Sequence, residues 1–100
     1  MEKMNFFISQ PMRDKTDVEI AVDRIKAIQE INEKFGEGHE ILPNYKKELK
    51  EVNPVYALGS TIQILSNADI CVFVKGWNKS RGCQIEHKIC EEYHITIWEI

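Results

Sequence analysis

The residues best suited to carry out chemistry lie between Gly76 and Glu86, at the point where an apolar run ends and a helical pattern begins. They include glycines, an aromatic residue, cations and a serine, namely Gly76, Trp77, Lys79, Ser80, Arg81 and Gly82. A loop of this kind before a helix presents unpaired N–H groups and the positive end of the helix dipole, which favour anionic ligands. Glu86 follows in the predicted helix, and a partly desolvated carboxylate there suits a nucleophile or a group that binds sugar hydroxyls. The alternative is an ordinary glutamate that the helix dipole favours.

A second polar group follows the first apolar run, residues 5–8, at a loop that contains Ser9, Gln10, Pro11, Met12, Arg13 and Lys15. Ser9 and Gln10 can hydrogen-bond a ligand or satisfy the loop backbone. The cations of the two loops can bind a phosphate or carboxylate, with arginine offering a bidentate fork, or they can remain solvated. Trp77 can stack on a base or cover the edge of the core.

Strands and helices that alternate along the chain must position these two loops. Thr16 and Glu19 form a capping box that opens a helix, and Gly36 and Gly38 end it. The predicted buried stripe of that helix is Val18, Ala21, Val22, Ile25, Ile28, Ile31 and Phe35. Residues 40–42 predict a short strand, and residues 44–52 predict either a loop or a short exposed helix.

The second half of the chain repeats the alternation. Asn53 and Pro54 predict a helix start, and residues 55, 58, 62 and 65 form its apolar face. Asn67 is predicted to end this helix in the left-handed conformation, and residues 68–74 form a strand. Ser80 is predicted to cap a helix that runs to about Tyr93, and residues 95–98 form the last strand.

This order predicts one α/β domain over residues 1–100, with three layers and a mainly parallel sheet of about four strands. Right-handed crossovers give the strand order 2-1-3-4. The chain then reverses direction across the sheet between strands 1 and 3, and ligands bind at the carboxyl ends of strands beside such a point. The loops around Ser9 and Gly76 are therefore predicted to meet.

Composition limits the classes of partner and the cellular location. The chain has 100 residues, 43% of them hydrophobic, and a net charge of −3 without a basic stripe, so a nucleic-acid polymer is not an expected partner. No apolar run is long enough to span a membrane, and the N-terminus lacks the apolar region of a signal peptide. Three cysteines fit reduced thiols, and we expect a cytoplasmic protein.

Cys83, His87, Cys90 and His94 resemble a zinc-binding set but lie along one helix. The first and last are separated by roughly 16 Å of helix rise, whereas zinc needs its donors within about 2.3 Å. We therefore expect no metal and no cofactor. Cys83 near a helix start is the alternative nucleophile, as a thiolate. The common glycine-rich phosphate-binding motifs are absent.

Three short segments resemble the nucleoside 2-deoxyribosyltransferase-like superfamily, in particular its small bacterial and phage proteins. They are Phe7-Ile8-Ser9-Gln10-Pro11-Met12, Ala68-Asp69 and Gly82-Cys83-Gln84-Ile85-Glu86, and the resemblance covers nearly the whole chain. The superfamily includes 2′-deoxynucleoside 5′-monophosphate N-hydrolases. The resemblance implies a flavodoxin-like sheet, cleavage of an N-glycosidic bond, and sites that are often shared across a homo-oligomer.

The resemblance also assigns roles. Glu86 matches the glutamate of the Gly-x-x-x-Glu pattern, which attacks the anomeric carbon and forms a glycosyl-enzyme intermediate, a chemistry shared with glycosidases. Ser80 stands where characterised transferases carry an aspartate, and the region of Ser9 replaces a tyrosine. Asp14, Glu48 and His87 are the candidates for the general acid, whereas Asp69 starts a strand at the opposite edge of the sheet.

The sequence thus predicts an N-glycosidase or deoxyribosyltransferase-like enzyme acting on a nucleoside or nucleotide. Arg13 and Arg81 would bind a 5′-phosphate or other anion, and Ser9, Gln10 and Trp77 would shape the sugar and base pocket. The absence of a clear second acid favours the alternative, a non-catalytic module that binds a nucleotide-derived small molecule. A structural protein without a small ligand is a third hypothesis.

Overall fold

A computed structural model describes residues 2–45 and 53–100, and it has the predicted alternation of strands and helices. In chain order the elements are β1 (Asn5–Ser9), α1 (Asp17–Phe35), β2 (Glu40–Ile41), α2 (Pro54–Leu65), β3 (Ile70–Phe73), a short 3₁₀ helix η2 (Trp77–Lys79), α3 (Arg81–Tyr93) and β4 (Thr96–Glu99). Of the segment for which a loop or a short helix was predicted, Asn44 and Tyr45 belong to neither a helix nor a strand, and the rest lies outside the described ranges.

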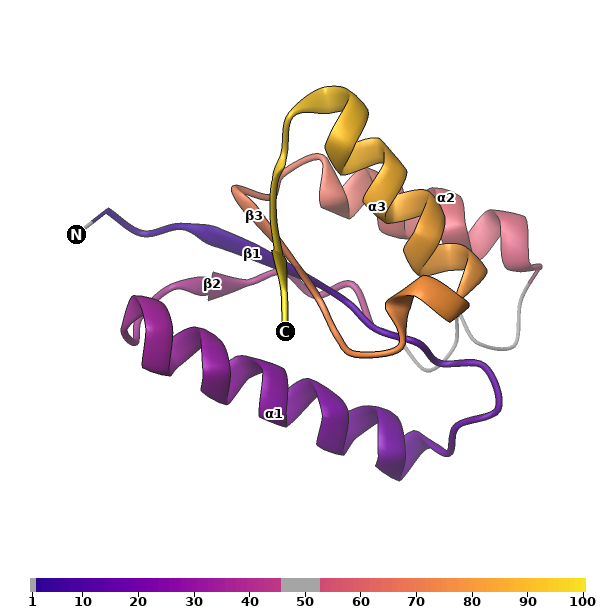
Figure 1. The fold of residues 1–100 in the computed structure, drawn as a ribbon, viewed down its shortest axis with the longest axis horizontal. Helices are drawn as coiled ribbons and strands as arrows, with labels where there is room; N and C mark the ends of the chain where they lie inside the picture. Colours follow the sequence, from indigo (N-terminus) through magenta and orange to yellow (C-terminus); the bar gives the residue numbers. More distant parts are fainter. Residues whose placement is uncertain (1, 46–52) are drawn as a thin grey trace.

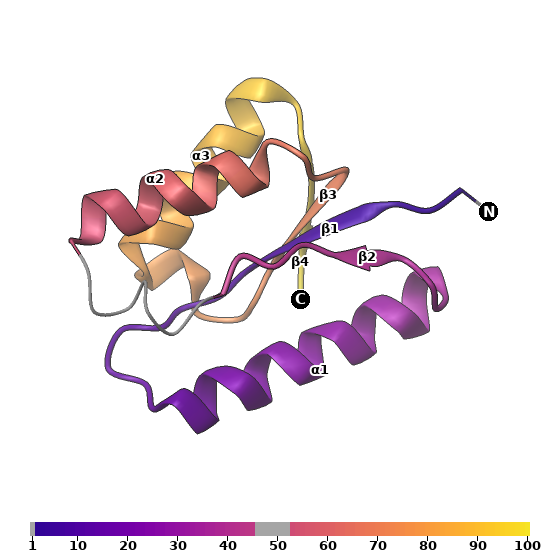
Figure 2. The same cartoon turned by 180° about the vertical axis from the view of Figure 1, so that it is seen from behind.

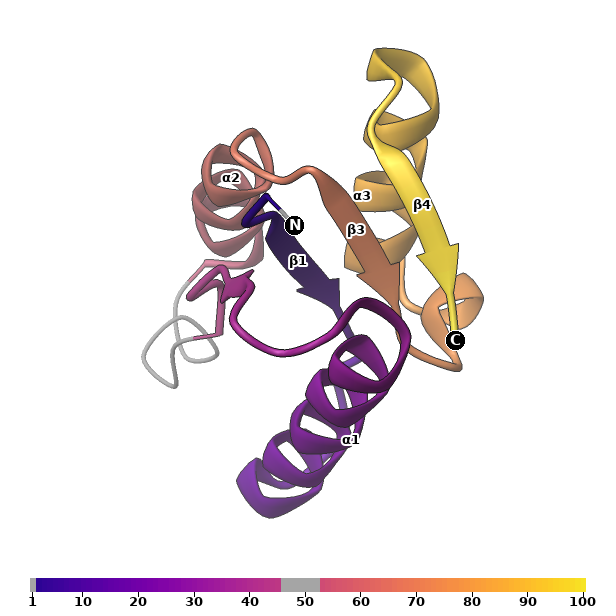
Figure 3. The same ribbon diagram turned by 90° about the vertical axis from the view of Figure 1, so that its left-hand side faces the viewer.

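The four strands form one parallel sheet in the order β2-β1-β3-β4, which confirms the predicted topology. Figure 3 shows β1, β3 and β4 pointing the same way. α1 covers one face of the sheet, and α2 and α3 lie together on the other (Figures 1 and 2). The molecule is therefore a three-layer α/β domain with both sheet faces covered, the arrangement that parallel sheets require.

The buried strand β1 supplies side chains to both faces because successive residues of a strand point in opposite directions. Phe6 and Ile8 pack under α1, whereas Phe7 packs with residues beneath α2 and α3. The clusters on both faces of the sheet are apolar, which explains why β1 is a continuous apolar run with no alternation. The last residue of this strand, Ser9, is also buried.

The buried face of α1 differs from the predicted stripe in the N-terminal half of the helix. Ile20, Ala27 and Ile31 face the sheet, but Val18, Val22 and Ile25 are 71%, 41% and 55% exposed, so the predicted stripe is wrong at its N-terminal end. Arg24 lies on the buried line between Ile20 and Ala27 and donates hydrogen bonds to the carbonyl of Leu42 and the side chain of Asn44. These polar contacts with residues beyond the end of β2 fix the rotation of α1 about its axis. The spacing of apolar residues in the sequence does not predict them.

The helix boundaries agree with the predicted caps in most places. Thr16 and Glu19 form the capping box, and Asn53 Oδ1 accepts hydrogen bonds from the backbone N–H groups of Val55 and Tyr56. The predicted left-handed stop at Asn67 is wrong, because among the described non-glycine residues only Asp14 and His94 have positive φ.

α2 instead ends through tight right-handed turns, in which the N–H of Asn67 bonds the carbonyl of Ile64. Strand β3 starts at Ile70, later than predicted. None of the helices in the described ranges has the length and apolarity needed to cross a bilayer.

Candidate functional site

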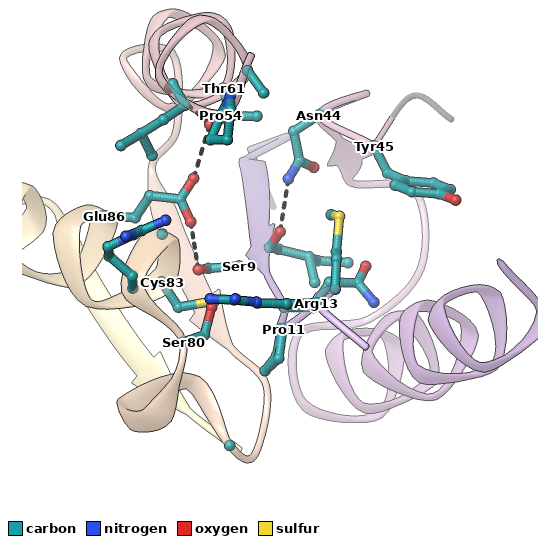
Figure 4. A pocket seen from close by; sticks show the side chains of 18 of the residues that line it. Ser9, Pro11, Arg13, Asn44, Tyr45, Pro54, Thr61, Ser80, Cys83 and Glu86 are labelled. Atoms are coloured by element: carbon teal, nitrogen blue, oxygen red, sulfur yellow. Dashed lines mark hydrogen bonds between the residues drawn. The ribbon is translucent and has the colours of Figure 1, made fainter. Parts of the chain in front are cut away.

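A cavity of about 990 Å³ opens at the carboxyl ends of β1 and β3, between the loop after β1, the start of α3 and one side of α2 (Figure 4). This is the point at which the chain reverses direction across the sheet, so the two loops meet as the topology predicts. Ten of the eleven predicted site residues line the cavity: Ser9, Gln10, Pro11, Met12, Arg13, Gly76, Ser80, Arg81, Gly82 and Glu86. The eleventh, Trp77, does not.

Glu86 lies at the wall of the cavity with its carboxylate held from two sides. Ser9 Oγ donates to Oε1 at 2.6 Å, and Thr61 Oγ1 lies 3.0 Å from Oε2. Figure 4 shows the carboxylate between the two hydroxyls, which come from β1 and α2. The residue is only 7% exposed, and a carboxylate so deep in a protein interior requires hydrogen-bond partners.

Burial raises the pKa of the Glu86 carboxyl above its usual value, while the hydrogen bonds from Ser9 and Thr61 act in the opposite direction. Desolvation disfavours the charged form, and donors to the carboxylate favour it. The net effect on the pKa is upward, a perturbation that is common among carboxyl groups of functional sites.

Thr61 is the site residue that sequence reasoning missed. It lies three residues after Leu58 and four before Leu65, on the side of α2 that faces the cavity and the core. A polar residue within the apolar face of a helix was the available signal. Its hydroxyl contacts both Glu86 and the carbonyl of Leu58.

Cys83 lies one turn before Glu86 and is almost fully buried in the cavity wall. Burial raises the pKa of its thiol, and the nearby Glu86 carboxylate adds to this rise, whereas hydrogen bonds with the hydroxyls of Ser80 and Ser9 lower it. The net rise keeps the thiol neutral, which argues against a thiolate nucleophile. Ser80 occupies the N-cap position of α3 as predicted, but its side chain makes no capping hydrogen bond.

Gln10 and Asn44 form the opposite wall. Gln10 Nε2 donates to the carbonyl of Ile20, and its Oε1 is buried without a hydrogen-bond partner in the part of the chain that the structure describes. Asn44 Nδ2 donates to the carbonyl of Ile8, the residue before Ser9, at 2.8 Å (Figure 4). Asn44 therefore fixes the end of β1, a role that the sequence does not reveal because the pattern of its segment fits either a loop or a short helix.

Three of the four predicted cations line the cavity. Arg13, Lys79 and Arg81 do so, and all of them are solvent-accessible. Lys15 does not line it, and its ammonium group lies 2.7 Å from the carboxylate of Asp23. The arrangement places positive charge at the mouth of the cavity and the buried carboxyl of Glu86 in its wall.

Trp77 turns away from the cavity and packs on the protein. Its indole ring stacks on His87, with ring centroids 4.0 Å apart and planes inclined by 5°, and it also contacts Phe73. The structure thus shows the alternative role for Trp77, which covers the edge of the core. His87 is held here as well, because its ring nitrogens contact Glu91 and Glu99 at 3.3 and 3.0 Å.

The candidates for the general acid lie in different places in the structure, and not all of them line the cavity. His87 is absent from the lining of the cavity, Asp14 is part of it, and Glu48 lies outside the described ranges. Asp69 is at the opposite edge of the sheet, as predicted, where its carboxylate accepts a 2.7 Å hydrogen bond from the backbone N–H of Asn5.

The arrangement of thiols and imidazoles gives no candidate metal centre. Within residues 2–45 and 53–100, no group of three or more His, Cys, Asp and Glu side chains is placed to hold a metal ion. Cys71 and Cys90 instead lie together in the apolar core as free cysteines. Comparison of the chain with protein-family models, with curated proteins and with solved structures finds no match.

Proposed function

We propose that this protein cleaves the N-glycosidic bond of a nucleoside or nucleotide, or transfers its deoxyribosyl group, with Glu86 as the nucleophile. The observation that carries the proposal is the buried carboxyl of Glu86, held by Ser9 and Thr61 in the wall of a cavity at the switch point of the sheet. The cavity volume of about 990 Å³ is at the upper end of the range for small-molecule sites. This site also coincides with the segments that resemble the nucleoside 2-deoxyribosyltransferase-like superfamily.

In the proposed reaction an oxygen of Glu86 attacks the anomeric carbon C1′. The bond between C1′ and the base nitrogen breaks, and its electron pair leaves with the base, which takes up a proton. Water or a second base then attacks C1′ and releases Glu86. An oxocarbenium-like transition state is stabilised by a carboxylate close to C1′, as in glycosidases generally.

Two further groups of side chains have roles in this proposal. Asp14 is the second carboxyl group among the described residues that line the cavity, and we assign to it the protonation of the leaving base. Arg13, Lys79 and Arg81 supply cations at the cavity mouth for a 5′-phosphate or another anion.

We also propose that the protein forms a homo-oligomer, which light scattering can measure. We further propose a location in the reducing cytoplasm, which is consistent with three buried free thiols.

The test is to incubate the protein with ribo- and deoxyribonucleosides and their 5′-monophosphates and to measure free base by chromatography. Base release by the wild type that disappears in Glu86→Gln supports the proposal, because the amide keeps the size and shape of the side chain but is not a nucleophile. Base release that persists in Glu86→Gln would exclude Glu86 as the nucleophile.

The second candidate function is a non-catalytic module that binds a nucleotide-derived small molecule in the same cavity. The upward shift in the pKa of Glu86 favours it, because the shift lowers the fraction of the nucleophilic carboxylate form at a given pH. Thermal stabilisation by one of the panel compounds, without release of base from any of them, would support binding. The absence of both effects would count against both functions.

A further inference from the structure

The hydroxyl of Thr61 lies between two hydrogen-bond acceptors. Thr61 Oγ1 is 2.9 Å from the carbonyl oxygen of Leu58 and 3.0 Å from Glu86 Oε2. A hydroxyl group carries one proton, and a backbone carbonyl never donates. Thr61 can therefore donate to Leu58 or to Glu86, but not fully to both.

The contacts of Thr61 with Leu58 and with Glu86 can both be full hydrogen bonds only when the Glu86 carboxyl group is protonated. A protonated Oε2 then donates to Thr61 Oγ1, and Thr61 donates to the carbonyl of Leu58. When the carboxyl group ionises, its proton passes to water in the cavity, and the Thr61 hydroxyl is free to turn and donate to Oε2. The Leu58 carbonyl belongs to α2. It therefore keeps its helical hydrogen bond from the N–H group of the residue four positions later.

Ser9 completes the arrangement from the other side of the carboxyl group. Its hydroxyl donates to Oε1 from the end of β1, so the two oxygens of Glu86 are held by different elements. Two donors on separate oxygens fix the plane of the carboxylate, whereas one donor leaves it free to rotate. Orientation of this kind matters because misplacing a reacting group by about 1 Å can cost roughly 100-fold in rate.

We propose that Thr61 is a positioning residue of this site, whose single hydroxyl proton turns from Leu58 to Glu86 Oε2 when the carboxyl group ionises and so orients the carboxylate. The inference rests on the proposed role of Glu86 as the nucleophile. Thr61 itself does not react with the substrate. Its hydroxyl group becomes a hydrogen-bond donor to Glu86 Oε2 when the carboxyl group ionises.

Several other titratable or charged groups surround Glu86 and must be held constant in a test. The thiols are those of Cys71 on β3 and of Cys83 and Cys90 on α3, each of which interacts electrostatically with Glu86. Arg13, Asp14, Lys79 and Arg81 also line the cavity. The matched variants below change none of them.

The experiment compares Thr61→Val, which is nearly isosteric but lacks the hydroxyl, with Thr61→Ser, which retains it. Thr96→Val, at an exposed position of β4, is the control for the substitution itself. The first readout needs no substrate: ¹³C NMR follows the titration of the Glu86 carboxyl carbon, assigned by its loss in Glu86→Gln. Both protonation states of Glu86 lose a hydrogen bond in Thr61→Val, but the charge-assisted bond that the ionised form loses is the stronger of the two. We therefore expect a higher midpoint in Thr61→Val, and midpoints near that of the wild type in Thr61→Ser and Thr96→Val.

An unchanged or lower midpoint in Thr61→Val would overturn the proposal. Thr61→Ala is the second variant if valine does not fold, and circular dichroism verifies each fold. The second readout is base release, for which kcat should fall roughly tenfold in Thr61→Val with little change in KM, and the acidic limb of the pH profile should move to higher pH. If the wild type releases no base, the proposed enzymatic function fails, yet the NMR titration still decides the role of Thr61.

Discussion

Ser9 Oγ lies 2.6 Å from Glu86 Oε1, and both side chains are buried. The hydrogen bond joins residues 77 positions apart and connects the end of β1 to the second turn of α3. It crosses the point at which the chain reverses direction across the sheet. The two segments that the sequence marked as chemically unusual are thus in direct contact through the residue proposed as nucleophile.

Ser9→Ala should weaken both the fold and the proposed reaction. We expect the free energy of unfolding to fall by about 1–3 kcal/mol, because a buried polar group loses its partner. The hydrogen bond from Ser9 lowers the pKa of Glu86, so the variant should need higher pH for ionisation, and the acidic limb of base release should shift upward. Urea denaturation and a pH–rate profile measure the two effects.

Ser66→Ala is the matched control for this prediction. Ser66 lies at the exposed C-terminus of α2, where its hydroxyl donates to the nearby carbonyl of Gln63. Its loss should leave the pH–rate profile unchanged. Equal shifts in both serine variants would contradict the specific role of Ser9.

The stability of the protein should depend on pH through Glu86. Burial raises the pKa of this carboxyl in the folded state, so between the unfolded and folded pKa values the folded protein binds more protons than the unfolded chain. The contribution of Glu86 to stability is therefore full below the unfolded pKa and is lost as pH rises through the folded pKa. The loss is at most about 1.4 kcal/mol per pH unit for one proton.

Glu86→Gln removes this titration. The difference in free energy of unfolding between Glu86→Gln and wild type, measured in urea at pH values from 4 to 8, should increase in favour of the variant as pH rises. A difference that stays constant over this range would show that Glu86 is not protonated more readily in the folded protein.

Trp77→Leu should affect stability without affecting substrate binding. The indole ring packs on His87 and Phe73 and does not line the cavity, so its loss removes half-buried apolar contact worth about 2 kcal/mol. The KM for any substrate identified in the panel should remain within about twofold of wild type, which is a change of less than 0.5 kcal/mol. Tyr93→Leu, at an exposed aromatic position, is the control for stability. A large rise in KM for Trp77→Leu would restore the base-stacking role.

Cys83→Ser should retain base release. The thiol is buried and its pKa is raised, so it carries no thiolate at neutral pH, and serine preserves a small polar group beside Ser9 and Ser80. We expect kcat to stay within roughly threefold of wild type, since no reacting group is lost. Complete loss of activity in a folded Cys83→Ser variant, together with retained activity in Glu86→Gln, would make Cys83 the nucleophile.

Arg81→Gln should distinguish phosphorylated from unphosphorylated substrates. Arg81 lines the cavity at the start of α3, where a cation and the helix N-terminus both attract anions. Loss of one charge-assisted contact should raise the KM for a nucleoside 5′-monophosphate about tenfold and leave that for the nucleoside nearly unchanged. Lys88→Gln, an exposed cation of α3 paired with Glu92, is the control. Equal effects on both substrates would exclude a phosphate contact at Arg81.

Much of this fold was predictable because its signals are local. The capping box at Thr16 and Glu19, the cap at Asn53 and the apolar runs each act over a few residues, and they fix the order of elements. That order, with right-handed crossovers, fixes the strand order and the meeting of the two loops. The place of Glu86 beside the site follows from the same local rules.

Tertiary structure alone decided how the side chains of these elements face one another. The partner of Glu86 on α2, Thr61, depends on the angle at which α2 packs beside α3, and no pattern within either helix contains that angle. Trp77 was ambiguous because a loop aromatic can face a ligand or the core, and contact with His87 and Phe73 settles its direction. The sequence by itself determined which elements form and where the site lies, since those follow from short-range periodicity and caps. Which groups touch the carboxyl group of Glu86 was decided by packing between segments far apart in the chain.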